Sequence, residues 1–185
     1  PCDVYEWFIK GDSRVLLDTL YRIIPSPVSK IIHLGCGISR LQDILFDNGY
    51  QNITNVDISP TCIDLMKKGD VRGMKWDVVD LMNPLPYGHN SFDFALDKGT
   101  LDALILSNVD KWEINEEDYA VSDRYLKNIN DVLAPGGVFV QITFGQPHFR
   151  RRLFERAFLG WTVNVHTIIE GDSFEFFCYE CRKSK

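Results

Sequence analysis

Apolar and polar positions alternate along this chain with two periods, one helical and one typical of buried strands. The segment 13–24 carries apolar residues at helical spacing, and Pro25 and Pro27 end it. From Lys30 to Asp131, short apolar runs alternate with amphipathic segments, which is typical of a parallel sheet that helices cover on both faces. The strands that we expect are 30–34, 53–58, 73–79, 92–96 and 138–144, with Pro135-Gly136-Gly137 as a break between the helix 119–133 and the last strand.

The C-terminal part of the chain has a different pattern. Residues 161–169 and 174–181 alternate between apolar and polar positions, and Glu170-Gly171-Asp172-Ser173 is a suitable hairpin connection between them. We expect this antiparallel hairpin to close an otherwise parallel sheet. The predicted fold class is therefore α/β, with a mostly parallel sheet, a C-terminal antiparallel hairpin and helices on both faces.

Length and composition predict one globular domain, residues 1–185. The chain has 185 residues, of which 45% are hydrophobic and 25% charged, and this is enough to bury one sizeable core. No apolar run is long enough to span a bilayer, so we expect no membrane partner. The formal net charge of −6 disfavours a nucleic-acid partner, because phosphate contacts need clustered Lys and Arg.

The cysteines and the first residue bear on location. Five cysteines are an odd number, which is typical of a reduced intracellular protein rather than a disulfide scaffold, and we expect a cytoplasmic protein. The chain begins at Pro1, so we expect native N-terminal sequence to be missing, and a mitochondrial location stays open. Cys178 and Cys181 form a C-x-x-C in a predicted strand, where their side chains point to opposite faces. We therefore expect no shared metal ion.

The candidate chemistry begins with a glycine turn. An apolar strand runs into Gly35-Cys36-Gly37, and the next strand ends in the carboxylate of Asp57. The two glycines let backbone amides approach a ligand, and a carboxylate about 20 positions further on can accept hydrogen bonds from a ribose diol. This arrangement predicts a site of nucleotide size.

Arg40 decides which nucleotide fits. A dinucleotide site requires a small residue at this third position of the glycine motif, for helix–strand packing around a pyrophosphate. S-adenosyl-L-methionine (AdoMet) requires a glycine turn beneath its methionine part, a carboxylate for the ribose and an acidic or amide group near the adenine. Gly35 to Gly37, Asp57 and Asp80 offer these groups at the ends of successive strands. The sequence favours AdoMet as the cofactor.

The order of the motifs resembles a known family. Leu34-Gly35-Cys36-Gly37 with Asp57 and Asp80, then Phe92-Asp93 and Leu133-Ala134-Pro135-Gly136-Gly137, look like a class I AdoMet-dependent methyltransferase. The resemblance covers nearly the whole chain. It implies a Rossmann-like, seven-stranded α/β fold and S-adenosyl-L-homocysteine as the product.

A narrower resemblance is to the small eukaryotic protein-lysine methyltransferases, the group that contains the elongation factor 1-alpha and citrate synthase lysine methyltransferases. It implies a protein substrate that carries the target lysine, and we expect the enzyme to be a monomer. The segments that carry it are 5–8, 96–103, 146–150 and 160–161. The cofactor-binding residues that it implies, with Gly37 of the glycine turn, are Trp7, Gly35, Asp57 with Ile58, Asp80 with Leu81, and Lys98.

Two features depart from the pattern of these families. A Trp-Asp-x-x-Tyr segment, which contributes cofactor contacts, would stand before the first residue of this chain. His33 stands where many methyltransferases carry an acidic residue that holds the methionine amine. The sequence therefore leaves that contact open.

Methyl transfer from a sulfonium is an in-line displacement, in which alignment supplies much of the acceleration. A lysine in a desolvated pocket has its pKa lowered toward the neutral amine, so we expect no dedicated base. Asp97 and Asp102 are candidates for lining the acceptor site, where a carboxylate attracts a lysine ammonium. The alternative interpretation of both is a strand end and helix cap.

Two charged clusters are candidates for contacts with a protein partner. Arg150-Arg151-Arg152 with Arg156 predicts a solvated helix face or a contact with an acidic partner. The acidic stretch 110–118 is a candidate lip for a basic substrate segment. The alternatives to a protein-lysine methyltransferase are a small-molecule methyltransferase and a catalytically silent AdoMet-binding scaffold.

Overall fold

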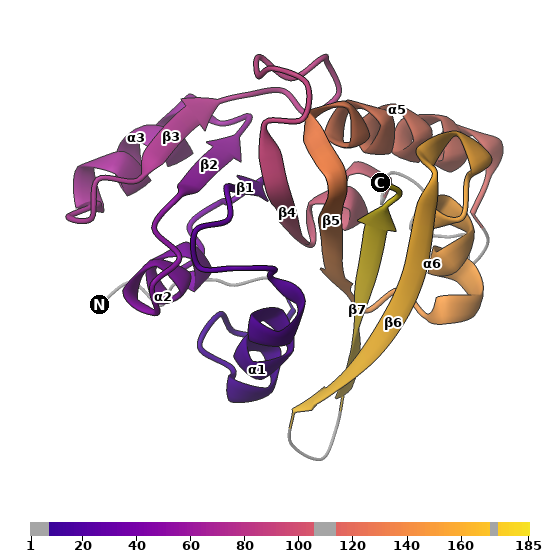
Figure 1. Cartoon of the computed structure of the whole chain (residues 1–185), viewed down its shortest axis with the longest axis horizontal. Helices are drawn as coiled ribbons and strands as arrows, with labels where there is room; N and C mark the ends of the chain where they lie inside the picture. The colour runs from indigo at the N-terminus through magenta and orange to yellow at the C-terminus, as the bar shows by residue number, and fades with distance from the viewer. Residues whose placement is uncertain (1–7, 106–113, 171–173) are drawn as a thin grey trace.

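A seven-stranded sheet with the order β3-β2-β1-β4-β5-β7-β6 forms the centre of the molecule (Figure 1). The structure, a computed structural model, describes residues 8–105, 114–170 and 174–185. The strands are β1 (Ile31–Leu34), β2 (Ile53–Asp57), β3 (Lys75–Val78), β4 (Phe92–Lys98), β5 (Leu133–Thr143), β6 (Trp161–Glu170) and β7 (Phe174–Lys183).

The pairing of the strands confirms the predicted mixed sheet. β3, β2, β1, β4 and β5 are parallel to one another, whereas β7 pairs antiparallel with both β5 and β6. In Figure 1 the β6–β7 hairpin extends past the other strands. The topology is that of the Rossmann-like, seven-stranded fold that the resemblance implies.

Four strands differ from their predicted bounds by two residues or more. β3 begins at Lys75 rather than at 73, and β7 ends at Lys183 rather than at 181. β4 continues to Lys98, two residues past the expected end, because Asp97 and Lys98 remain paired with β5. β5 begins at Leu133 rather than at 138, and the register shift between Phe92 and Phe94 accommodates Pro135-Gly136-Gly137 within it. The prediction of a break at this tripeptide is therefore wrong for the strand, although the preceding helix does end at Val132.

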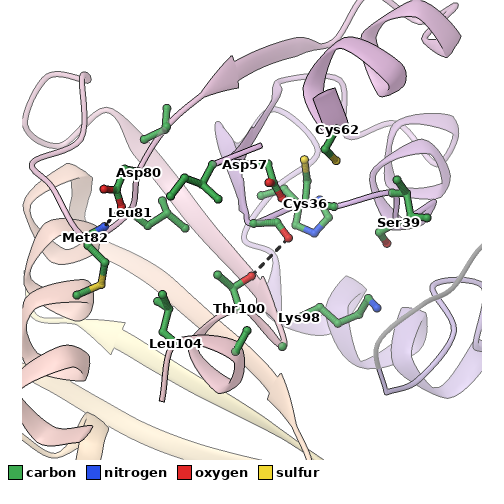
Figure 2. Close-up of a pocket in the computed structure, with 18 residues that line it drawn as sticks. Cys36, Ser39, Asp57, Cys62, Asp80, Leu81, Met82, Lys98, Thr100 and Leu104 are labelled. Carbon is green, nitrogen blue, oxygen red and sulfur yellow. Dashed lines mark hydrogen bonds between the residues drawn. The ribbon is translucent and has the colours of Figure 1, made fainter. Parts of the chain in front are cut away.

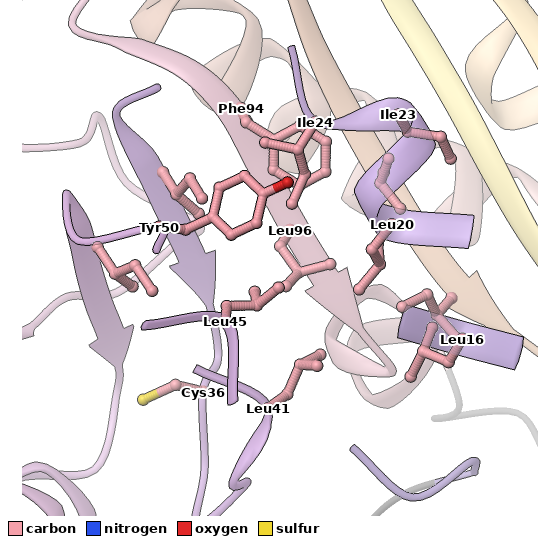
Figure 3. Packing of buried hydrophobic residues seen from close by; sticks show 14 of the residues in the cluster. Leu16, Leu20, Ile23, Ile24, Cys36, Leu41, Leu45, Tyr50, Phe94 and Leu96 are labelled. Carbon is pink, nitrogen blue, oxygen red and sulfur yellow. The ribbon is translucent and has the colours of Figure 1, made fainter. Parts of the chain in front are cut away.

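Helices cover both faces of the sheet, and each face has its own apolar core. On one face, Leu16 and Leu20 of the first helix and Leu45 of the second pack toward Phe94 and Leu96 of β4 (Figure 3). The helices on this face are α1 (Arg14–Ile23), α2 (Leu41–Asp47) and α3 (Pro60–Gly69). The other face is covered by α4 (Thr100–Ile105), α5 (Glu116–Val132) and α6 (Pro147–Phe154), after which a 3₁₀ turn spans Ala157–Leu159.

The ends of the helices follow from local capping chemistry. Ser13 and Ser59 accept hydrogen bonds from backbone amides of the first turns of α1 and α3. α5 begins with a capping box between Asn115 and Asp118. Because these side chains satisfy amides that a helix leaves unpaired, they fix where each helix leaves the sheet edge.

The C-x-x-C of β7 has the geometry that the sequence predicts. Cys178 packs into the core on the α1 face, whereas Cys181 packs into the core on the α5 face. In the described part of the chain, no group of three His, Cys, Asp or Glu side chains is arranged to hold a metal ion. No helix within the described residues has the length and apolar character needed to cross a membrane.

Candidate active site

A cavity of about 490 Å³ opens at the carboxyl ends of β1, β2 and β4 (Figure 2). This is the edge at which open α/β sheets bind ligands. Its volume lies in the range of small-molecule sites, about 300–1,000 Å³. The residues that line it are His33, Gly35, Cys36, Gly37, Ile38, Ser39, Asp57, Ile58, Cys62, Val79, Asp80, Leu81, Met82, Lys98, Gly99, Thr100, Ala103 and Leu104.

The two glycines of the turn have different roles. Both have left-handed backbones, with φ of 58° at Gly35 and 52° at Gly37. A Cβ on Gly35 would lie 2.2 Å from Oγ1 of Thr100, and this hydroxyl donates a hydrogen bond to the carbonyl of Leu34 at 2.8 Å. A Cβ on Gly37 would meet nothing within 4 Å. Gly35 therefore admits Thr100, whereas Gly37 leaves open space for a ligand.

Asp57 joins the glycine turn to the start of α3. Its Oδ2 accepts a hydrogen bond from the Gly37 amide at 2.9 Å, and its Oδ1 accepts one from the Ser59 amide at 2.9 Å. A carboxylate has about four acceptor positions, so these bonds leave room for the two hydroxyls of a ribose. Ser59 itself caps α3 by accepting from the Cys62 amide at 3.2 Å. Asp57 is thus held rigidly at the wall of the cavity.

A second rigid turn follows β3. Oδ1 of Asp80 accepts from the Met82 amide at 2.9 Å, and Oδ2 accepts from the Asn83 side chain at 2.8 Å. Nδ2 of Asn128, from α5, donates to the Leu81 carbonyl at 3.0 Å. These bonds confirm that Asp80 begins a turn, and the same turn presents Asp80 and Leu81 to the cavity. Adenine binding by Asp80 stays a prediction.

Apolar side chains and two buried basic residues complete the wall. Ile58 is 66% exposed at the cavity and offers a flat apolar face for a ring. Lys98 and His33 are both buried and line the cavity on the β4 and β1 side. Of the predicted cofactor residues, seven therefore lie on one cavity, namely Gly35, Gly37, Asp57, Ile58, Asp80, Leu81 and Lys98. Trp7 lies outside the described residues.

The two cysteines of the cavity are not activated nucleophiles. Burial and the neighbouring Asp57 carboxylate raise the pKa of the Cys36 thiol far above its ordinary value. Burial, with Asp57 second, also raises the pKa of Cys62. Because the thiolate is the reactive form, this site does not use covalent thiol chemistry. The open cradle at Gly37 and the remaining acceptor positions of Asp57 fit AdoMet.

Asp97 lies behind the cavity wall rather than on it. Its side chain is 0% exposed, and it accepts hydrogen bonds from the amides of Thr100 at 2.7 Å and Leu101 at 3.0 Å. The hydroxyl of Tyr125 donates a third at 2.7 Å. Burial, together with the charge of Asp102, raises the pKa of Asp97 to about 7. Asp97 is therefore the cap of α4, and the structure does not place it at the acceptor site.

Asp102 is also buried, at 6% exposure, on the side of α4 that faces away from the cavity. It pairs with Arg150 at 2.5 Å and accepts from the hydroxyl of Thr143 at 2.6 Å. Burial raises its pKa, against the opposing effect of Arg150. Neither Asp102 nor Asp97 lines the cavity, because α4 turns both carboxylates toward the interior.

The residues of the two charged clusters differ in burial and in ion pairing. Arg150 is buried, so the interpretation of the arginine cluster as a solvated face is wrong for this residue. Arg151 pairs with Glu155 at 2.6 Å on the surface, and Arg156 pairs with Asp123 at 2.7 Å. Of the acidic stretch, Glu116 to Asp118 form the first turn of α5, and 110–113 lie outside the described residues.

Sequence reasoning missed several residues of the cavity. Thr100, Ala103 and Leu104 come from α4, a helix that was not predicted, and Met82 follows the Asp80 turn. Thr100 and Ala103 lie within the segment 96–103 that carries the narrower resemblance, which was the available signal. Six residues of α4 are too few to display a helical period.

Comparison with known proteins agrees with this geometry. Residues 32–141, more than half of the chain, match the family described as "Methyltransferase domain". EEF1A lysine methyltransferase 4 of Bos taurus is 35% identical over 183 residues, which cover 98% of this chain and 69% of that protein. The protein of the same name in Mus musculus is 35% identical over 178 residues, or 94% of this chain and 67% of that protein.

Solved structures share the fold at low sequence identity. A SAM-dependent methyltransferase from Methanosarcina mazei superposes with a TM-score of 0.66 at 17% identity, covering 89% of this chain and 97% of that one. A Burkholderia thailandensis N1-methyltransferase with bound S-adenosylhomocysteine has a TM-score of 0.65 at 17% identity, covering 94% and 80%. Together with the family match and the 35% identity to the bovine relative, these findings show that the chain belongs to the class I AdoMet-dependent methyltransferases.

Proposed function

We propose that this protein methylates a lysine side chain of translation elongation factor 1-alpha. The observation that carries the proposal is the 35% identity, over 98% of the chain, to a relative named as an EEF1A lysine methyltransferase. A second kind of relative, the eEF1A lysine and N-terminal methyltransferase of Danio rerio, is 35% identical over 89% of this chain, which covers 22% of that longer protein. Both names point to the same protein substrate.

Each part of the cavity has a task in holding the cofactor. AdoMet supplies a methyl group activated by its sulfonium sulfur. Gly37 leaves space above the turn for the methionine part, and the Asp57 carboxylate orients the ribose. The rigid turn at Asp80 and Leu81, with the exposed face of Ile58, encloses the adenine. Preorganised walls of this kind fix the direction from which an acceptor approaches.

The chain supplies position rather than a proton acceptor. Asp97 has a pKa of about 7, a value suited to a general base. However, its side chain is fully buried, and its oxygens already accept from two backbone amides and from Tyr125. A lysine that enters an apolar cavity loses hydration, which lowers its pKa and favours the neutral amine. The acceptor therefore arrives as a nucleophile without the help of Asp97.

Labelled AdoMet tests this function directly. The protein is incubated with cell lysate and AdoMet that carries a labelled methyl group, and modified residues are located by mass spectrometry. Label on a lysine of elongation factor 1-alpha is the expected result. Label only in small metabolites would favour a small-molecule methyltransferase, and AdoMet binding without any transfer would favour a silent scaffold. The Asp57→Asn variant, assayed at subsaturating AdoMet, is the control in which transfer is expected to fall.

We further propose that the protein acts in the cytoplasm as a monomer. Cys36, Cys62, Cys178 and Cys181 are all free thiols, which supports a reducing compartment. Cell fractionation tests the location, and light scattering on the purified protein tests the oligomeric state.

A further inference from the structure

Two separate anchors hold α4 in place. At its start, Asp97 accepts from the Thr100 and Leu101 amides, and the Thr100 hydroxyl donates to the Leu34 carbonyl. This first anchor ties α4 to the cavity wall. The second anchor is the ion pair between Asp102 of α4 and Arg150 of α6, which lies on the side of α4 away from the cavity.

The second anchor is buried and is not fully satisfied. The side chains of Arg150 and Asp102 are each 9% exposed, with Nη2 and Oδ1 2.5 Å apart. Thr143 and Gln141 also donate to the Asp102 carboxylate, at 2.6 and 3.2 Å. Nη1 of Arg150 nevertheless has no hydrogen-bond partner, and neither does Oε1 of Gln141. A buried ion pair with unsatisfied groups contributes little to stability. We therefore consider which segment the pair keeps in position.

The ion pair keeps the turn from β5 into α6 in position. The Arg150 side chain lies so close to Gly145 that a Cβ there would be 2.5 Å from Nε. The Gly145 amide donates to the Thr143 hydroxyl at 2.9 Å, and the Tyr179 hydroxyl donates to the Gly145 carbonyl at 2.5 Å. Residues 144–149, which we name the acceptor loop, comprise the turn after β5 and the first three residues of α6. They are held through Arg150 on one side and Tyr179 on the other.

The order of the strands places this loop at the reacting end of the cofactor. Along the sheet edge, Asp80 follows β3, Asp57 ends β2, Gly35 follows β1 and Lys98 ends β4. The adenine, ribose and methionine parts of AdoMet take the first three places in the proposed site. β5 is the next strand, with Ile142 paired to Lys98, and the acceptor loop begins one residue after β5 ends.

We propose that Arg150 is a positioning residue for the methyl acceptor. Its ion pair with Asp102 fixes the acceptor loop against α4, whereas the Asp97 anchor holds the start of α4 at the cofactor cavity. The assignment of the loop to a lysine acceptor rests on the proposed function. The claim that the ion pair holds the acceptor loop, and not the cofactor site, does not depend on the proposed function.

Arg150→Gln separates the two anchors. We expect kcat/KM for the protein acceptor to fall by up to about 100-fold, chiefly through kcat, since a misplacement of about 1 Å costs that much. We expect the AdoMet dissociation constant, measured by calorimetry, to equal that of the wild type. Hydrogen exchange of the backbone amides of residues 144–146, 148 and 149 should become faster, and Pro147 has no amide hydrogen to report. The protein acceptor used to measure kcat/KM is the protein that becomes labelled in the lysate experiment.

Three further variants keep the test decisive. Arg150→Lys keeps the charge but loses the planar fork, so we expect partial recovery of kcat. The double variant Asp102→Asn with Arg150→Gln leaves no unpaired buried charge and serves if the single variant does not fold. Arg151→Gln is the matched control, because this neighbour on α6 pairs with Glu155 at the surface rather than with Asp102.

The outcomes are distinguishable. Faster exchange confined to the acceptor loop, with AdoMet affinity unchanged, supports the inference. Unchanged exchange in the loop overturns it, and so does a loss of AdoMet affinity that parallels the loss of turnover. If the wild type transfers no methyl group to any protein, the proposed function fails, and the exchange and calorimetry results still decide whether the ion pair holds the loop.

Discussion

Gly35 and Gly37 share a left-handed backbone but differ in their surroundings. Thr100 occupies the space beside Gly35, whereas nothing lies near a Cβ built on Gly37. The first glycine is therefore required by packing within the protein, and the second by space for a ligand. Spacing alone predicted that both glycines belong to a binding turn. It could not show that one is required by packing and the other by space for a ligand.

Alanine at the two positions should separate them. We expect Gly35→Ala and Gly37→Ala both to lower the free energy of unfolding by about 1–2 kcal/mol, because of the left-handed backbone. Gly35→Ala should lose about 1–3 kcal/mol more, because its methyl group overpacks Thr100. Urea denaturation measures the difference, with Gly69→Ala at the end of α3 as the control. Equal losses at the two positions would contradict the assignment.

Ribose binding by Asp57 stays a prediction, and the structure places this residue at the wall of the cavity. Because charged hydrogen bonds contribute about 1.5–3 kcal/mol, we expect Asp57→Asn to weaken AdoMet binding by about 10- to 150-fold. Isothermal titration measures the dissociation constant. Asp64→Asn, on the exposed side of α3, should bind AdoMet like the wild type. An unchanged affinity in Asp57→Asn would exclude Asp57 from the cofactor site.

For Asp97 the structure shows the alternative interpretation, a helix cap, and for Asp102 it shows a buried ion pair with Arg150. Both stand near the end of a strand, as Asp57 does, and the type of residue was right for a polar site. Whether such a carboxylate faces a cavity or the interior depends on the helix that follows. α4 directs Asp97 to its own first-turn amides and Asp102 to Arg150, and no local pattern in the sequence specifies that direction.

At the scale of elements, α1 and the buried apolar strands were predictable, and α4 was not. The helix at Arg14–Ile23 and the strands β1 and β2 were expected within one residue of their observed bounds. The helix has a clear helical period, and the two strands are short buried runs. α4 has six residues, too few for a period to stand out. α6, with eight residues, was expected only as an arginine-rich helix face without bounds. Those two helices carry the acceptor side of the molecule, so this side was the least predictable.

The cap of α4 makes stability depend on pH. Burial raises the pKa of Asp97 to about 7, whereas an unfolded chain has a value of about 3.9. The folded state therefore keeps its proton to higher pH than the unfolded state does. The contribution of Asp97 to the free energy of unfolding falls as the pH rises through this window, by at most about 1.4 kcal/mol per pH unit. Above about pH 7 the loss is complete and constant.

Asp97→Asn should reduce this slope, because it removes the titrating group. Urea denaturation between pH 4 and pH 8 gives the free energy of unfolding of both proteins at each pH. Asp102, whose pKa burial also raises, leaves a residual slope of the same sign in the variant. A variant with the same pH dependence as the wild type would show that Asp97 does not titrate in this window.

At the scale of the whole molecule, the sheet places the parts of the site in sequence along one edge. The alternation of strands and helices predicted the parallel sheet, and the change of period after residue 160 predicted the hairpin. The motifs at the ends of β1, β2 and β3 converge on one cavity, as the topology requires. The strand pairing that brings β5 beside β4 comes from long-range contacts, which a local pattern does not contain.

The most direct test of the account is methylation of purified elongation factor 1-alpha. The wild-type protein and Asp57→Asn are each incubated with the factor and AdoMet, and the lysine-containing peptides are analysed by tandem mass spectrometry. The account predicts methyl groups on a lysine of the factor with the wild type, at a rate that falls at least about 10-fold with Asp57→Asn at subsaturating AdoMet. A wild-type protein that binds AdoMet but leaves every lysine of the factor unmodified would contradict it.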